Sequence, residues 1–308
     1  AVSQQIFLPI LSDEQKESLH VNREIDFGYN HGAHRFRVNI YFAKGFLGAS
    51  FRLIPDRIKT IEELGLPTSI RDLIINKNDG QELILVTGPT GEGKSTTLAS
   101  MINELNTKYG KHILTIEDPI EYIYPPGKSV VSQREVGQDT HSWDIALRSA
   151  LREDPDIVLI GEMRDYESIQ KALTIAETGH LVFSTVHTNS AAQTIDRIMD
   201  VFPPHQQAQV RIQLASVLKA IVSQRLLPNI QNTGRVPACE LLINSPAIAA
   251  IIREGKTHLI DNVIQTSTKE GMMFFENYVA MLYSKGIISA EVARAYAIRP
   301  KEIERLLQ

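Results

Sequence analysis

The residues with the clearest chemical pattern are 88–95, which read GPTGEGKS and fit the phosphate-loop pattern G-x-x-x-x-G-K-[ST]. The apolar run before this loop predicts a buried strand, and the run after it predicts a helix. Glycines let such a loop turn its backbone N–H groups toward phosphates, and the helix N-terminus adds a partial positive charge. Lys94 is expected to reach the β- and γ-phosphates of a nucleotide, and Ser95 to bind Mg²⁺ through its hydroxyl. The nucleotide-binding candidates here are Gly88, Thr90, Gly91, Glu92, Gly93, Lys94, Ser95 and Thr96.

A second group of candidates consists of polar residues that follow predicted strands. Glu117, Glu162 and His187 each come at or just after the end of a short apolar run that predicts a buried strand. Ligands of open α/β sheets bind at the carboxyl ends of strands, so these side chains are expected to face the phosphate loop. Glu162 is the first candidate for general base or water-positioning residue, and for holding Mg²⁺ through water, and Glu117 is the second. His187 is expected to hydrogen-bond the γ-phosphate. The alternative for either carboxylate is a satisfied surface or capping acid.

Other polar residues near the same strands are expected to lie outside this site. Asp154 and Asp156 precede the strand that Glu162 follows, about 15 Å away at ~3.3 Å per residue, and are interpreted as turn or helix-end residues. His180 lies before the strand that ends at His187, roughly 23 Å away in an extended chain, so the two histidines are not expected to share a phosphate. His180 is therefore expected to be structural or to lie at a subunit contact.

Four arginines are candidates for contacting phosphates. Arg35 and Arg37 project from one face of a predicted strand, and Arg52 lies on the next predicted strand. Arg134 lies on a short predicted strand before Gly137. An arginine that reaches a neighbour's γ-phosphate can raise the rate of hydrolysis by about 10³–10⁵. The alternative is that these are solvated side chains on strand faces.

The elements that must position these residues divide the chain into an N-terminal α/β module (1–62), a linker (63–80), an alternating α/β core (81–228) and a mainly helical C-terminal region (229–308). Alternating strand and helix patterns predict a parallel sheet with helices on both faces. The expected strands are 34–42, 48–54, 83–87, 112–116, 130–136, 158–160, 181–186 and 236–243. The expected helices are 96–109, 142–152, 167–178, 191–201, 206–226, 245–254 and 274–283, with a short one inside the linker.

Composition limits the classes of protein to consider. A hydrophobic content of 43% and a charged content of 22% are ordinary for a folded globular chain. The net charge of −4 indicates no broad basic surface, so nucleic acid is not expected as a partner. The single cysteine, Cys239, excludes an intramolecular disulfide and a cysteine-built zinc site, and its apolar surroundings predict burial. Without an apolar run near 18 residues or a signal peptide, the chain is expected to lack a membrane span and to be cytoplasmic.

Taken together, these residues resemble the PilT family, the retraction ATPases of type IV pili, within the wider secretion ATPase superfamily. The resemblance runs from about residue 32 to about residue 285, and four ordered motifs carry it. Shorter matches are RFRVN at 35–39 and QREVG at 133–137. The four motifs are the Walker A loop 88–95, the Asp box TIEDPIEY at 115–122, the Walker B box LREDPDIVLIGEMRD at 151–165 and the His box TGHLVFSTVHTN at 178–189.

The resemblance implies a RecA-like P-loop core and a small PAS-like N-terminal domain, with ATP held between them. It implies Mg²⁺-dependent hydrolysis of ATP to ADP and phosphate, with Glu162 catalytic and N-terminal arginines helping to bind phosphates. It implies a homohexameric motor that contacts an inner-membrane platform protein at the pilus base. Such a motor drives pilin disassembly, and with it pilus retraction and twitching motility. The expected location is the cytoplasm, in peripheral association with the inner membrane.

Three features depart from the family pattern. Glu92 stands where the family usually has a small residue, and its carboxylate is expected to point to solvent, because pointing inward it would repel phosphates. Residues 251–256, IIREGK, keep only part of a family motif that is tied to retraction. The chain also opens inside the expected N-terminal domain, without its usual first strands.

Two other functions stay open at this point. One is a motor for another secretion system or for DNA, which salt-sensitive DNA binding would support. The other is a non-catalytic, nucleotide-binding regulatory subunit, favoured only by Glu92 and the altered motif at 251–256. The pilus assembly and secretion ATPases usually carry a four-cysteine metal motif, which a chain with one cysteine cannot form, and this favours the retraction branch.

Overall fold

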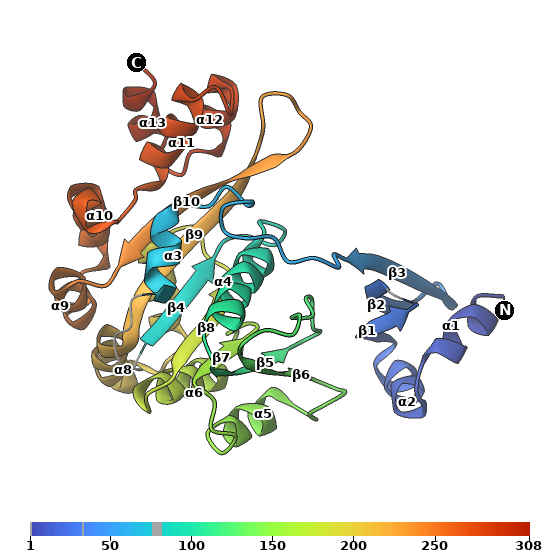
Figure 1. Cartoon of the computed structure of the whole chain (residues 1–308). Coiled ribbons are helices and arrows are strands. Elements are labelled where there is room, and N and C mark those ends of the chain that lie inside the picture. The colour runs from blue at the N-terminus through green and yellow to red at the C-terminus, as the bar shows by residue number, and fades with distance from the viewer. Residues whose placement is uncertain (1, 33, 76–81) are drawn as a thin grey trace.

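The structure, a computed structural model, describes residues 2–32, 34–75 and 82–308, so residues 76–80 of the predicted linker lie outside the described part. It contains a three-stranded sheet near the N-terminus and a seven-stranded sheet in the larger unit. Figure 1 shows the small sheet and its helices on one side of the molecule, joined to the large sheet by the segment that follows β3. The predicted α/β class, with a small N-terminal sheet and C-terminal helices, is confirmed.

The N-terminal sheet is antiparallel, with the order β1-β2-β3. Its register places Phe27 opposite Val38, and both side chains are buried under Leu19 of α2. The predicted strands 34–42 and 48–54 are confirmed. β1 was not predicted, because its outer positions carry Glu, Asp, Gly and Asn, which have low strand propensity. The elements of this unit are α1 (Val2–Phe7), α2 (Asp13–Asn22), β1 (Glu24–His31), β2 (His34–Ala43) and β3 (Phe46–Ile54).

The large sheet has the strand order β10-β9-β4-β8-β7-β5-β6. All neighbouring strands in it are parallel except β9 and β10, which pair antiparallel, so the sheet is mixed and not purely parallel as predicted. The predicted strands before residue 190 are confirmed. The strands are β4 (Glu82–Thr87), β5 (His112–Glu117), β6 (Val130–Glu135), β7 (Ile157–Ile160), β8 (Leu181–Val186), β9 (Leu218–Pro228) and β10 (Arg235–Ile243).

Helices cover both faces of this sheet and give a three-layer core. Successive residues of a strand point to opposite faces, so Leu83 and Leu85 of β4 join one buried cluster while Ile84 and Val86 join the other. Ser142 caps α5 by accepting the backbone N–H of Ile145. The helices are α3 (Thr68–Ile75), α4 (Lys94–Lys108), α5 (Trp143–Ala150), α6 (Tyr166–Glu177), α7 (Ala191–Asp200) and α8 (Pro204–Val217).

The predicted helix 206–226 is wrong in its second half. α8 ends at Val217, and Leu218 is already extended. Residues 220–222 are apolar and fully buried, because β9 lies between β4 and β10 with both faces covered. A continuous apolar run of this kind fits a buried strand and a buried helix equally well, so periodicity misled the prediction. The division expected at residue 228 falls in the turn between β9 and β10.

The C-terminal helices attach to the core through a buried ionic cluster. Arg299 pairs with Glu240 of β10, Glu276 of α11 and Asp261 of α10, and both glutamates are fully buried. Cys239, next to Glu240, is buried as predicted. No helix in the described ranges is long and apolar enough to cross a membrane. The helices are α9 (Pro246–Glu254), α10 (Ile260–Thr266), α11 (Phe275–Ser284), α12 (Ala290–Tyr296) and α13 (Pro300–Leu306).

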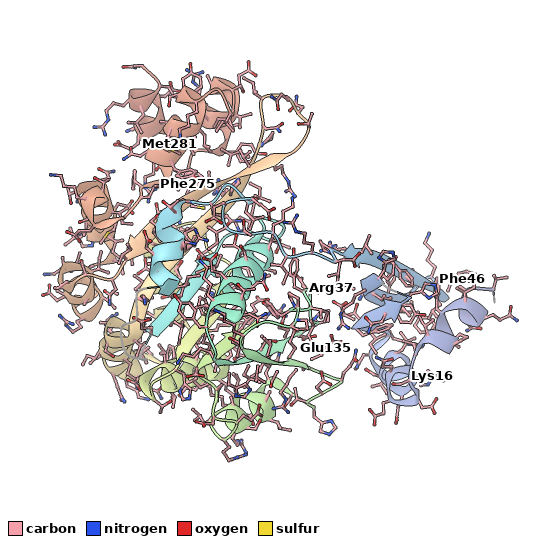
Figure 2. The ribbon with its side chains drawn as sticks, in the orientation of Figure 1. Lys16, Arg37, Phe46, Glu135, Phe275 and Met281 are labelled. Carbon is pink, nitrogen blue, oxygen red and sulfur yellow. The ribbon has the colours of Figure 1, made fainter. Side chains whose placement is uncertain are left out.

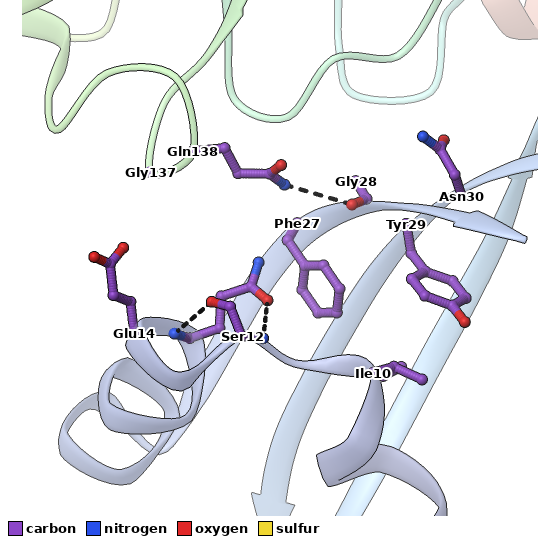
Figure 3. Close-up of a pocket in the computed structure, with 10 residues that line it drawn as sticks. Ile10, Ser12, Glu14, Phe27, Gly28, Tyr29, Asn30, Gly137 and Gln138 are labelled. Carbon is purple, nitrogen blue, oxygen red and sulfur yellow. Dashed lines mark hydrogen bonds between the residues drawn. The ribbon is translucent and has the colours of Figure 1, made fainter.

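Glu135, at the end of β6, joins the N-terminal unit to the core. Its buried carboxylate accepts the backbone N–H of Gly28 on β1 at 3.0 Å and the guanidinium of Arg35 on β2 at 2.7 Å. Gln138 donates to the Gly28 carbonyl (Figure 3). Two core side chains, Glu135 and Gln138, therefore bond the backbone N–H and C=O of Gly28. Figure 2 labels Glu135 of the core and Arg37 of the N-terminal unit close to this junction. A Cβ at position 28 would collide with the guanidinium of Arg35 and the carboxylate of Glu135, so a larger residue there would have to displace this ion pair.

Candidate active site

A cleft of about 920 Å³ lies between the N-terminal unit and the carboxyl ends of the central strands. Its walls contain the phosphate loop, the ends of β5, β7 and β8, and the arginines Arg37 and Arg52 from the N-terminal sheet. This is the edge of the sheet at which parallel strands present their ligands. Of the predicted site residues, the cleft is lined by Thr90, Gly91, Gly93, Lys94, Ser95, Thr96, Glu117, Glu162, His187, Arg37 and Arg52.

The phosphate loop is held in the shape that its glycines permit. Gly88 has a φ of 148° and packs so closely on the end of β9 that a Cβ would lie 2.4 Å from the carbonyl oxygen of Gln224. Gly93 adopts the left-handed conformation directly before α4 begins at Lys94. The ammonium of Lys94 donates to the carbonyl oxygens of Gly88 and Pro89, each at 2.8 Å. Two backbone carbonyls of the loop thus hold the ammonium group that we expect to bind the phosphates of a nucleotide.

Lys94, His187 and Glu162 form a connected chain of polar groups. The Nζ of Lys94 lies 3.3 Å from Nδ1 of His187, and Nε2 of the same ring lies 3.0 Å from a carboxylate oxygen of Glu162. Burial, together with the nearby ammonium of Lys94, lowers the pKa of His187, which favours the neutral ring at pH 7. A neutral ring with these two partners accepts at Nδ1 and donates from Nε2.

Glu162 carries a charge in this arrangement. Burial alone would raise the pKa of its carboxyl, but the hydrogen bond from Arg164 at 2.7 Å, with the charges of Arg164 and Lys94, holds that pKa below its usual value. Burial likewise lowers the pKa of Lys94, and the charge of Glu162 opposes that shift. The structure therefore places a carboxylate, an imidazole and an ammonium in line beside the loop.

Glu117 is the more buried of the two candidate carboxylates. It accepts the hydroxyl of Thr115 at 2.7 Å and the amide of Gln133 at 3.4 Å. Burial raises the pKa of its carboxyl to about 7, although both hydrogen bonds act in the opposite direction. A carboxyl that titrates near neutrality is suited to accept and return a proton at physiological pH.

The raised pKa of Glu117 predicts a pH-dependent stability. Between its ordinary value of 4.5 and about 7, the unfolded chain releases the proton while the folded chain keeps it. The free energy of unfolding therefore falls as pH rises through this window, by up to about 3 kcal/mol at about 1.4 kcal/mol per pKa unit. Replacing Glu117 with glutamine removes this loss.

Urea unfolding of the unchanged chain and of Glu117→Gln at pH 4.5 and pH 8 checks this expectation. The variant is expected to gain stability relative to the unchanged chain as pH rises. An equal difference at both pH values would contradict the assigned titration. Glu153→Gln is the matched control, because that carboxylate pairs with Arg134 away from the cleft.

The four candidate arginines separate into two pairs. Arg37 and Arg52 line the cleft, and Arg37 bonds Asp26 and Glu121. Arg35 is directed to Glu135 and to the carbonyl of Ile120 instead. Arg134 points to α5, where it pairs with Glu153 at 2.6 Å and donates to Ser149. The structure thus brings one pair to the cleft and leaves the other pair in structural contacts.

The residues expected to lie elsewhere are indeed elsewhere. Asp156 accepts the backbone N–H of His112 and the ammonium of Lys111, at the opposite end of the sheet. His180 bonds the carbonyl of Ile175 and the hydroxyl of Thr178 at the end of α6, which is a structural role. Neither residue lines the cleft.

The expectation for Glu92 needs correction. Its carboxylate does not simply point to solvent but accepts the backbone N–H of Leu226 on β9. Sequence reasoning missed Arg164, Gln224 and Arg235 as residues of this site. Arg164 pairs with Glu162, and Gln224 and Arg235 bond the phosphate loop. The spacing of Glu162 and Arg164 on one extended segment was a usable signal. No local sequence pattern indicated that Gln224 and Arg235, in the β9–β10 hairpin, would contact the phosphate loop.

Comparison with known proteins places this site in a family. The family model described as Type II/IV secretion system protein matches residues 33–286. The type IV pilus retraction ATPase PilT of Pseudomonas aeruginosa is 48% identical over 293 residues, which cover 95% of this chain and 84% of that protein. The chain belongs to the PilT family of secretion ATPases.

Two further likenesses agree with this membership. The twitching motility protein of Neisseria gonorrhoeae is 47% identical over 289 residues, which cover 94% of this chain and 76% of that protein. The crystal structure of the pilus retraction motor PilT with bound ADP superposes with a TM-score of 0.89 at 46% identity, covering 98% of this chain and 85% of that one. The resemblance read from the four motifs is confirmed, and this PilT-family chain is an ATPase of the secretion ATPase family.

Proposed function

We propose that the cleft binds Mg²⁺-ATP and hydrolyses it, and that the chain uses this hydrolysis to power pilus retraction. The observation that carries the proposal is the set of contacts that joins Lys94, His187 and Glu162 beside Ser95 and the phosphate loop. The 48% identity to a pilus retraction ATPase, over 95% of this chain, also supports the proposal. Phosphoryl transfer depends mainly on positioning and on charge stabilisation, and this cleft offers both.

In the proposed mechanism, the phosphates draw the ammonium of Lys94 away from the carbonyls of Gly88 and Pro89. That exchange replaces two neutral acceptors with anionic ones, which attract the ammonium more strongly. Glu162 keeps its charge, and it orients the attacking water and accepts its proton. When Lys94 moves to the phosphates, Nδ1 of His187 can donate to the γ-phosphate once the ring takes up a proton, which the negative charge of the phosphate favours.

The oxygen donors of the cleft fit a magnesium ion. Mg²⁺ in nucleotide sites takes one or two protein oxygens, the substrate phosphates and several waters, so a dense cluster of protein ligands is not required. The described residues contain no cluster of three potential ligands, but the Ser95 hydroxyl and the Glu162 carboxylate both line the cleft. Ser95 would hold the ion directly, and Glu162 would hold it through water. When bound, the ion neutralises charge on the phosphate oxygens.

The remaining polar groups complete the proposed site. Arg37 and Arg52 are placed to bind phosphates from the N-terminal side, and Glu117 is a second proton acceptor whose pKa lies near neutrality. Arg35 and Arg134 do not face the cleft in this structure, so a phosphate contact by either would require movement away from Glu135 or Glu153. For Arg35, leaving Glu135 would change the position of the N-terminal unit relative to the core.

For the assembly, we propose a homohexameric ring with a PAS-like N-terminal domain and a RecA-like core in each subunit. The proposed partner is an inner-membrane platform protein, and the proposed location is the cytoplasmic side of that membrane. These proposals rest on membership of the PilT family. Nucleic acid is not a proposed partner, because the net charge of −4 gives no broad basic surface.

The proposed function is tested by placing the gene in a bacterium that lacks its own PilT but still assembles pili. Restored twitching by the unchanged chain, and none by Glu162→Gln at equal expression, is the expected result. The purified chain should hydrolyse ATP and elute at the size of a hexamer when nucleotide is added. An active ATPase that never restores twitching would argue for a different secretion machine, and a chain without turnover would argue for a regulatory subunit.

A further inference from the structure

The end of β9 has an unpartnered edge that the phosphate loop covers. β4 pairs with β9 only as far as Thr87 opposite Ser223, after which β4 turns into the loop. β9 continues to Pro228, so within the described part of the chain its last residues have no neighbouring strand on that side. The backbone groups of β9 on the open side therefore need partners from elsewhere.

The phosphate loop packs along this open side of β9 and is hydrogen-bonded to it. Gly88 packs against the carbonyl of Gln224, whose side-chain amide donates to the carbonyl of Glu92 at 2.7 Å. The carbonyl of the same Gln224 side chain accepts the hydroxyl of Thr97 at 2.7 Å, in the first turn of α4. Gln224 is buried, so these bonds are shielded from water. The loop thus occupies the place that another strand would take beside β9.

Glu92 makes the only side-chain contact of this set that starts in the loop itself, among the residues that the structure describes. Its carboxylate accepts the backbone N–H of Leu226, two residues beyond Gln224. Arg235, on the neighbouring strand, donates to the carbonyl of Gly91 at 3.3 Å. Hydrogen bonds from β9 and β10 therefore hold the loop at Gly91 and at Glu92. A short side chain at position 92 would leave the N–H of Leu226 without this acceptor.

We propose that Glu92 is a positioning residue that fastens the phosphate loop to β9 and thereby sets the affinity for nucleotide. A loop that is already ordered before binding loses less conformational entropy when phosphates arrive. The side chain acts through the loop backbone and does not touch the ligand. The proposal deepens the proposed function of the cleft and rests on it, since it concerns the same nucleotide site.

The negative charge of Glu92 opposes the gain in nucleotide affinity that an ordered loop provides. A carboxylate in the loop repels the phosphates, and this repulsion weakens with added salt. The two effects can be separated by substitution, because glutamine keeps an oxygen acceptor for the N–H of Leu226 while it removes the charge. Alanine removes both. Comparing Glu92→Gln with Glu92→Ala at one ionic strength therefore measures the fastening alone.

The test measures the Kd for ADP and the KM and kcat for ATP. These values are compared between the unchanged chain and both variants, at low and at high salt. Glu92→Ala is expected to bind ADP about fivefold more weakly than Glu92→Gln at either salt concentration, the effect of one ordinary hydrogen bond. The KM for ATP should differ in the same ratio while kcat stays the same. Glu92→Gln should bind more tightly than the unchanged chain at low salt, and this gain should shrink at high salt.

The matched control is Glu291, an exposed acid in the first turn of α12, replaced by the same two residues. Its variants are expected to bind ADP like the unchanged chain. Equal ADP affinity of Glu92→Gln and Glu92→Ala would overturn the proposal, as would a difference confined to kcat. If the unchanged chain binds no nucleotide at all, the proposed function fails, and that outcome is distinct from equal binding by the two variants.

Discussion

Replacing Glu162 with glutamine is expected to lower ATP turnover by at least about a hundredfold while ATP binding changes by less than about threefold. The carboxylate lies at the end of the line from Lys94 through His187, where a water attacking the last phosphate would need an acceptor for its proton. Glutamine has nearly the same shape and accepts the hydrogen bond from Arg164, so the cleft keeps its form. What it loses is the charge and the ability to take a proton.

Steady-state phosphate release and equilibrium binding of ATP measure the two halves of this expectation. Glu167→Gln is the matched control, because Glu167 is an exposed acid in the first turn of the helix that follows Glu162. The control should hydrolyse ATP at the unchanged rate. Turnover by Glu162→Gln within tenfold of the unchanged protein would exclude a proton-accepting role for Glu162.

Replacing Lys94 with alanine is expected to abolish useful nucleotide binding. The ammonium is buried at the loop, where it now bonds two backbone carbonyls, and it is the group that phosphates would attract. A hydrogen bond to a charged group contributes about 1.5–3 kcal/mol, and 1.4 kcal/mol corresponds to tenfold in affinity. The Kd for ADP should therefore rise roughly ten- to hundredfold or more.

Calorimetric titration with ADP measures this loss directly. Lys108→Ala, at the other end of the same helix, is the control, since Lys108 pairs with Glu104 away from the cleft. The control protein should bind ADP like the unchanged chain. Retained ADP affinity in Lys94→Ala would mean that the phosphates lie elsewhere in the cleft.

Much of the core could be predicted because its signals are local. The phosphate loop is fixed by a run of eight residues, and the strands beside it are buried on both faces and so read as continuous apolar runs. Once parallel strands are accepted, their carboxyl ends must share one edge. Glu117, Glu162 and His187 were found by that rule, and all three line the cleft.

The parts that could not be predicted depend on contacts between distant segments. β9 was read as a helix because its apolar residues fit both periods, and only its place between β4 and β10 makes it a strand. Arg35 and Arg37 stand two residues apart on β2, yet one pairs with Glu135 and the other lines the cleft. Long charged side chains select partners according to which acids the fold brings near, and the sequence of β2 does not contain that information.

Glu92 shows the same limit inside the strongest motif. Its sequence context explains why a carboxylate should avoid the phosphates, but the acceptor it provides serves a strand 134 residues away along the chain. The partner exists because β4 stops pairing at Thr87 and leaves the N–H of Leu226 open. Local pattern therefore identified the nucleotide site, and tertiary structure was needed to say how its loop is held.

The most direct measurement is phosphate release from ATP by the purified chain alone, with Mg²⁺ and with the metal chelated. If the cleft hydrolyses ATP through Lys94, His187 and Glu162, the chain releases many phosphates per protomer with Mg²⁺ present, and release stops on chelation. A chain that binds ATP one to one, yet releases no phosphate under any nucleotide or Mg²⁺ concentration, would contradict hydrolysis in this cleft.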